Sequence, residues 1–239
     1  MIEREITVTT PEGAMPTFVC HPDDGGPHPV VLYLMDAPGI REALREMARR
    51  LAAAGYYVML PNLYYRAGQF EELGMSDEDA HRRAELMQTV NPTNIVSDAG
   101  ALLAAADDDP AAGDGPVGAV GFCMSGGLAL SVARAFPERV AAVASIHGAW
   151  LVRDTEDSPH LGLDAVRAEV HFAWVVPDGT APEGTIPVME QALTEAGVTY
   201  TIDREPDAQH GFAPAGPRHD PEASERHWAR VLDLFERNL

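Results

Sequence analysis

Lysine is absent from the 239-residue chain, so all 17 basic side chains are arginine, and they stand against 37 acidic ones. The resulting net charge of −20 repels nucleic-acid phosphates and anionic lipid headgroups, so we expect neither as a partner. No apolar run approaches the roughly 20 residues of a membrane-spanning helix. No basic stretch followed by an apolar one opens the chain, so we expect no signal peptide and a cytoplasmic location.

Cysteine is nearly absent as well. Cys20 and Cys123 are the two in the chain, and in a cytosolic protein they are expected to be free thiols. No group of His, Cys and Asp has the spacing of metal ligands, so we expect no metal. The segment 113–118 matches a dinucleotide-binding fingerprint by letters, but it precedes a strand instead of opening a helix, and Pro116 disrupts the turn.

Short apolar runs alternate with helical patterns along the chain. An alternating pattern around a Pro-Glu-Gly turn predicts an N-terminal hairpin over residues 6–20. Apolar runs predict strands at 30–34, 57–60, 117–120, 140–146 and 169–176, and the repeating order of elements predicts a further strand at 199–204. Helical periodicity predicts helices at 40–51, 95–106, 126–136, 186–196 and 222–237. This order favours an α/β fold with a mostly parallel sheet that helices cover on both faces.

One stretch does not follow this pattern. Residues 63–91 are irregular and polar, and we interpret them as an excursion that passes over the sheet and the active site. No linker divides the chain, so we expect residues 1–239 to form a single domain.

The strongest chemical signal joins the strand ending at Val120 to the helix after it. A sharp strand-to-helix turn exposes its central side chain and requires small residues two positions before and after it. Gly121 and Ser125 occupy those positions, and Cys123 is the central residue. The N-terminus of the following helix stabilises an anion, which favours a nucleophilic thiol over a buried structural cysteine.

A thiol nucleophile requires a base, and the base requires an acid that orients it. Asp178 follows the strand expected at 169–176, and His210 follows the strand expected at 199–204. The carboxyl ends of parallel strands share one edge of a sheet, so we expect both side chains to meet Cys123 there. His147 also ends a strand at this edge, and we interpret it as a hydrogen-bonded wall residue.

The loop after the strand 30–34 is the expected source of an oxyanion donor. Pro38 has no N–H, so the Ala37 N–H is the candidate, together with the Met124 N–H beside the nucleophile. Asp36 would lie near the thiol and oppose its ionisation. An ordinary loop or helix-capping carboxylate is the alternative for Asp36, and both stay open.

On these residues the chain resembles the dienelactone hydrolase family of α/β-hydrolase-fold proteins. The matching segments are Asp36–Gly39, Leu60–Arg66, Gly121–Met124, Asp178 with Pro182, and His210–Phe212. The resemblance implies a triad of Cys123, His210 and Asp178, no cofactor, and hydrolysis of a carboxylic ester or lactone. It also implies that the acidic residue at position 36 pairs with the resting thiol and is displaced when substrate binds.

The chain departs from the family pattern at two positions. Asp36 stands where the family usually has Glu, and Pro214 stands where characterised members have an Arg that holds the substrate carboxylate. Such a charge-assisted contact contributes about 1.5–3 kcal/mol to substrate binding. Because this chain lacks the Arg, we do not assign dienelactone itself as the substrate. We interpret the arginines that could replace it as surface charges, namely Arg41, Arg66, Arg82 and Arg83.

We therefore expect a cysteine hydrolase that acts on a small-molecule ester or lactone through an acyl-thioester, as a monomer or a homodimer. Two alternatives stay open. One is a different cysteine enzyme with a tight-turn nucleophile, such as a DJ-1-like protein or an amidotransferase. The other is a non-catalytic ligand-binding protein on the same scaffold.

Overall fold

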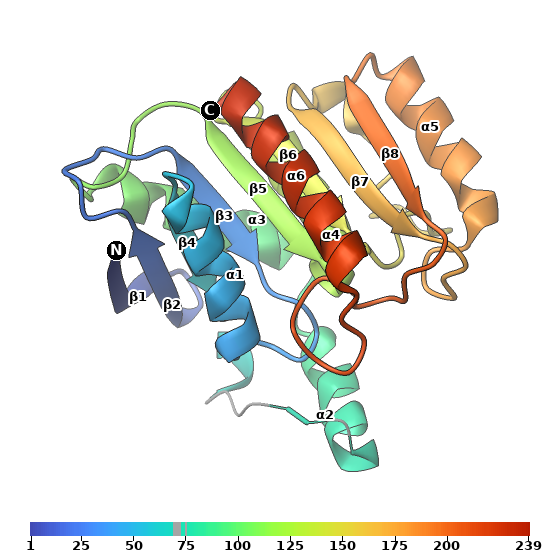
Figure 1. Ribbon diagram of the computed structural model, residues 1–239, viewed down its shortest axis with the longest axis horizontal. Coiled ribbons are helices and arrows are strands. Elements are labelled where there is room, and N and C mark those ends of the chain that lie inside the picture. The colour runs from blue at the N-terminus through green and yellow to red at the C-terminus, as the bar shows by residue number, and fades with distance from the viewer. Residues whose placement is uncertain (69–72, 75) are drawn as a thin grey trace. The chain divides into compact units, whose positions relative to one another are not determined.

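The computed structural model describes residues 1–68, 73–74 and 76–239, and these form two compact units, Met1–Gly115 and Pro116–Leu239 (Figure 1). Each unit has its own buried strands and helices. Within the described residues, no helix has both the length and the apolar character needed to cross a membrane. The single domain over residues 1–239 stays a prediction.

The first unit is built on four strands. β1 (Ile2–Thr10) and β2 (Gly13–His21) form the expected antiparallel hairpin. β2 pairs antiparallel with β4 (Tyr57–Pro61), and β4 pairs parallel with β3 (Val30–Leu34). Every residue of β3 and β4 is buried, as the continuous apolar runs predict for strands covered on both faces.

Two long helices cover this sheet. α1 (Glu42–Ala53) packs on β2 and β4 through one face that carries Leu44, Met47 and Leu51. α3 (Pro92–Asp107) contacts β1 and β3, and in Figure 1 it lies behind the strands while α1 lies in front. The Asn91 side chain caps α3 by accepting a hydrogen bond from the Asn94 N–H at 2.9 Å.

The irregular stretch 63–91 contains more regular structure than its pattern indicates. A short 3₁₀ helix, η1, covers Tyr65–Ala67, and α2 covers Asp77–Met87. α2 buries only Leu86, so it lacks an apolar stripe, but Ser76 and Asp79 form a capping box that fixes its start. Residues 69–72 and 75 of this stretch lie outside the described residues, and its place over the active site stays a prediction.

The second unit is an all-parallel sheet. Its strands are β5 (Val117–Phe122), β6 (Val140–Ile146), β7 (Glu169–Val175) and β8 (Tyr200–Glu205), paired in that order. The carboxyl ends of these strands lie at one edge, because parallel neighbours run in the same direction. This edge carries the turns that hold Cys123, His147, Asp178 and His210.

Helices cover both faces of this sheet. α6 (Pro221–Asn238) approaches β5 so closely that a Cβ on Gly118 would lie 2.9 Å from Phe235. Ser145 of β6 faces the opposite side and meets Gly126 at the start of α4 (Gly126–Ala135). α5 (Ile186–Glu195) links β7 to β8 (Figure 1). Eight strands in the two units, with helices against them, confirm the α/β fold class and its N-terminal hairpin.

Candidate active site

Cys123 occupies a strained turn between β5 and α4. Its φ of 55° lies in the left-handed region, which residues other than glycine rarely adopt. Gly121 is required there, because any Cβ would collide with the Ser125 carbonyl. The Ser125 hydroxyl accepts a hydrogen bond from the Phe122 N–H at 2.9 Å and donates one to the Phe122 carbonyl at 3.0 Å. The turn thus leaves the Cys123 side chain partly exposed, as a nucleophile requires.

His210 and Asp178 form a close polar pair at this edge. The His210 Nδ1 lies 2.6 Å from the Asp178 Oδ2, and the Asp178 side chain is 3% exposed. Asp178 follows β7, and His210 follows β8, so two neighbouring strands deliver the pair. Because a carboxylate only accepts hydrogen bonds, it fixes the proton on Nδ1 and turns Nε2 towards the reacting groups.

The charges of this pair reinforce each other. Burial alone would raise the pKa of Asp178, but hydrogen bonds from His210 and Thr180 lower it to about 2. Burial alone would lower the pKa of His210, but hydrogen bonds to Asp178 and to Cys123 raise it to about 10. His210 therefore carries a proton at neutral pH and contacts both the acid and the thiol.

His147 packs edge-on against His210 in a buried environment. Its ring is fully buried, and its centroid is 5.3 Å from that of Phe212 and 5.9 Å from that of Phe122. Neither ring nitrogen has a hydrogen-bond partner among the described residues, which corrects our expectation of a hydrogen-bonded wall residue. Burial and the neighbouring His210 hold the pKa of His147 well below its usual value, so it is neutral and unsuited to be the base.

Asp36 and Ala37 belong to the first unit. The Asp36 carboxylate is buried and accepts two hydrogen bonds from the Arg41 guanidinium, at 2.7 and 2.9 Å. The Tyr64 hydroxyl donates to the Ala37 carbonyl at 2.8 Å, which fixes this loop. Arg41 is thus the partner of Asp36. This corrects our interpretation of Arg41 as a surface charge. The roles of Asp36 towards the thiol and of the Ala37 N–H towards an oxyanion stay predictions.

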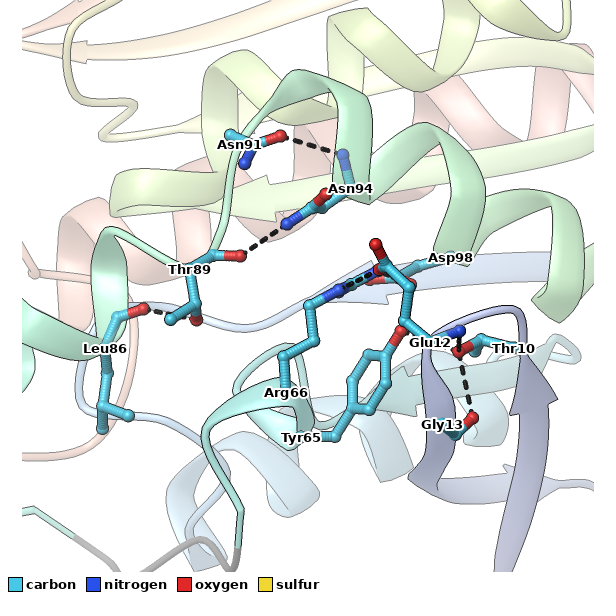
Figure 2. A network of polar contacts seen from close by, with 10 residues as sticks. All are labelled: Thr10, Glu12, Gly13, Tyr65, Arg66, Leu86, Thr89, Asn91, Asn94 and Asp98. Atoms are coloured by element: carbon cyan, nitrogen blue, oxygen red, sulfur yellow. Dashed lines mark hydrogen bonds and ion pairs between the residues drawn. The ribbon is translucent and has the colours of Figure 1, made fainter.

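Arg66 is not a surface charge either. Its guanidinium donates two hydrogen bonds to Asp98, at 2.7 and 2.8 Å, and another to Glu12. Figure 2 shows these side chains side by side. The Tyr65 hydroxyl lies 2.8 Å from both Asp98 and Thr10. Asp98 is 2% exposed, so this network joins η1, α3 and the hairpin turn through a buried charge. Sequence reasoning missed it, because no spacing relates position 66 to position 98.

The other two arginines fit our interpretation. Arg82 pairs with Glu85 on α2 at 2.9 Å, and Arg83 donates to the Gly74 carbonyl.

Thr180 contacts the pair of Asp178 and His210, and the sequence did not lead us to expect this contact. The pattern Asp-x-Thr is a turn signal in which a carboxylate accepts hydrogen bonds from a residue two positions on, and it could have been recognised. Across the described residues, no three His, Cys, Asp or Glu side chains gather to hold a metal ion.

Comparison with known proteins shows the family of the chain. The profile of the dienelactone hydrolase family matches residues 15–239. A Rhodococcus opacus carboxymethylenebutenolidase is 29% identical over 90% of this chain and 84% of its own. A Yersinia pestis protein with the same name, given provisionally, is 30% identical over 97% of this chain and 86% of its own.

Solved structures share the fold over the whole chain. A provisionally named dienelactone hydrolase of Klebsiella pneumoniae has a TM-score of 0.88 at 25% identity, covering 98% of both chains. A dienelactone hydrolase of Anabaena variabilis has a TM-score of 0.70 at 21% identity, covering 100% of this chain and 98% of its own. These matches favour neither a DJ-1-like protein nor an amidotransferase. The chain is a hydrolase of the dienelactone hydrolase family.

Proposed function

We propose that this protein hydrolyses a carboxylic ester or lactone through an acyl-thioester on Cys123, with His210 and Asp178 completing the triad. The observation that carries the proposal is the hydrogen-bonded series from Cys123 to His210 to Asp178 at the end of a left-handed strand-to-helix turn. The name of the Rhodococcus opacus relative supports a lactone as the substrate class.

The raised pKa of His210 favours the imidazolium form, and in the proposed mechanism this imidazolium holds the proton of the Cys123 thiol. In the first step the Cys123 sulfur attacks the carbonyl carbon, and the carbonyl oxygen becomes an oxyanion. The Met124 and Ala37 N–H groups are the proposed donors to that oxyanion, and one such donor contributes about 3–4 kcal/mol. The His210 Nε2–H then protonates the departing oxygen, which in a lactone remains attached to the acyl group.

The second half of the reaction reverses these roles. His210 has given up its proton, so it accepts one from a water molecule that attacks the thioester carbonyl. The tetrahedral intermediate collapses, the carbon–sulfur bond breaks, and the carboxylic acid leaves. Asp178 holds the imidazole in one tautomer throughout and stabilises it whenever it carries the second proton.

The experiment combines turnover with trapping of the intermediate. Wild type is expected to hydrolyse p-nitrophenyl acetate and members of a lactone panel, and rapid acid quenching followed by mass spectrometry is expected to find one acyl group on Cys123. Cys123→Ala should remove both signals while retaining the fold by circular dichroism. Cys20→Ala is the matched control, because Cys20 is buried in β2 and burial raises the pKa of its thiol to about 12.

Full turnover by the folded Cys123→Ala variant contradicts the nucleophile assignment. Absence of turnover by wild type on every ester and lactone tested contradicts the proposed substrate class.

A further inference from the structure

Thr180 contacts both members of the acid–base pair with one hydroxyl group. Its Oγ1 lies 2.8 Å from the Asp178 Oδ1 and 3.3 Å from the His210 Nδ1. The backbone N–H of Thr180 also donates to the Asp178 Oδ1, at 2.7 Å. One carboxylate oxygen thus receives both Thr180 donors, and the other oxygen remains for His210.

The Thr180 hydroxyl donates a hydrogen bond to Asp178 and accepts one from His210. A carboxylate only accepts, so the single Thr180 O–H proton points to Asp178. A lone pair on the same oxygen then faces the His210 Nδ1–H. This N–H donates a bifurcated hydrogen bond, to Asp178 at 2.6 Å and to Thr180 at 3.3 Å. The hydroxyl therefore restrains rotation of the carboxylate and of the imidazole together.

The backbone of Thr180 is hydrogen-bonded to a segment that also contacts the turn of Cys123. The Trp150 N–H donates to the Thr180 carbonyl at 2.8 Å, and the neighbouring Ala149 N–H donates to the Cys123 carbonyl at 2.9 Å. Trp150 adopts a left-handed φ of 52°, which residues other than glycine rarely adopt. Residues 149–150 thus connect the turn of the nucleophile to the loop of the acid.

We propose that Thr180 is a positioning residue that fixes the Asp178 carboxylate and, through it, the His210 imidazole in the geometry for proton transfer to Cys123 and the leaving group. This inference rests on the proposed triad. It adds a fourth side chain, which acts on the reaction only through Asp178 and His210.

The test compares Thr180→Val with Thr180→Ser. Valine keeps the branched shape and the backbone N–H but lacks the hydroxyl, whereas serine keeps the hydroxyl. With p-nitrophenyl acetate, we expect Thr180→Val to lower kcat per titrated active site by roughly ten- to a hundredfold, the effect of losing one hydrogen bond to a charged group, with KM changed little. Thr180→Ser should recover most of that loss.

The pH dependence separates positioning from a folding defect. The Thr180 hydroxyl helps to lower the pKa of Asp178, so its removal should shift the acidic limb of kcat/KM to higher pH. A variant that is merely less stable would lose active sites without moving this limb. If Thr180→Val fails to fold, Thr180→Ala provides the same comparison with serine.

Wild-type kcat and an unmoved acidic limb in the folded valine or alanine variant overturn the inference. Failure of serine to recover activity overturns it as well. Cys123→Ala is measured in parallel, because turnover by that variant contradicts the triad itself, whereas an inactive Cys123→Ala beside a fully active Thr180→Val contradicts Thr180 alone.

Discussion

The imidazole of His147 lies edge-on against the imidazole of His210, with 5.2 Å between the ring centroids. His210 is charged at neutral pH, and His147 is held neutral by burial. Two identical side chains therefore have opposite protonation states, because only His210 faces a carboxylate and a thiol.

His147 is expected to act by packing and not by proton transfer. His147→Phe keeps an aromatic ring against Phe212 and removes two unpaired buried nitrogens, so we expect kcat to stay within about threefold of wild type. His147→Ala should lower it more, because it leaves a cavity beside His210. Ester turnover by the purified variants checks this, and an inactive but folded His147→Phe would assign His147 a chemical role.

Asp178 is expected to contribute mainly through its charge and its hold on one tautomer. Asp178→Asn keeps the shape of the side chain, but its amide also carries a donor, so it no longer fixes the Nδ1 proton. By precedent from a hydrolytic triad, kcat should fall about 10⁴-fold. Glu190→Gln on α5 is a control outside the site. A loss of less than tenfold in Asp178→Asn would contradict the role of the carboxylate.

Asp36→Asn tests whether the Asp36 carboxylate opposes ionisation of Cys123. If it does, removal of this charge increases the rate at which iodoacetamide alkylates Cys123 at neutral pH. The experiment uses a Cys20→Ala background, so that one thiol is followed by mass spectrometry. Arg41→Met is the informative companion, because it leaves Asp36 unpaired and should slow alkylation. Unchanged rates in both variants would limit Asp36 to a structural role.

Arg66 is expected to stabilise the fold through Asp98. Arg66→Met leaves a buried carboxylate without its charged partner, which costs about 3–5 kcal/mol of unfolding free energy. Asp98→Asn added to Arg66→Met should recover part of that loss, since it removes the unpaired charge. Urea unfolding measures each variant, with the exposed Arg82→Met as control. A loss no larger than that of Arg82→Met would show that the network in Figure 2 contributes little.

His171 predicts an acid-dependent loss of stability. Burial lowers the pKa of His171 to about 4 in the folded chain, against 6.5 as its ordinary value. As pH falls from 6.5 to 4, the unfolded chain takes up a proton that the folded chain does not, so stability decreases by up to about 3 kcal/mol.

His171→Asn removes this titration and retains a polar group for the Thr201 hydroxyl, which lies 2.8 Å from the His171 Nδ1. The variant's unfolding free energy, measured by urea titration at each pH, should therefore fall less between pH 6.5 and 4 than that of wild type. His81→Asn, at an exposed position of α2, is the matched control. Parallel curves for wild type and His171→Asn would contradict the prediction.

The sequence alone determined the strands, the long helices other than α2, and the order of the reactive residues. The strand expected at 140–146 and β6 have the same bounds, as do the strand at 30–34 and β3, because a continuous apolar run shows directly which residues are buried. The turn around Cys123 was equally readable, since the left-handed backbone and the close contact at Gly121 are local requirements. The structure brings His210 to Asp178 as expected, because both follow neighbouring parallel strands.

Only the tertiary structure decided which polar groups meet and which side chains lose water. Arg66 and Asp98 are 32 residues apart, Thr180 and His210 are 30 apart, and no periodicity in the chain links either pair. α2 was missed because its apolar face is almost absent and its start depends on two side chains, Ser76 and Asp79. A sequence pattern records what each segment must bury, whereas hydrogen bonds and pKa values depend on distances between segments that only the folded chain fixes.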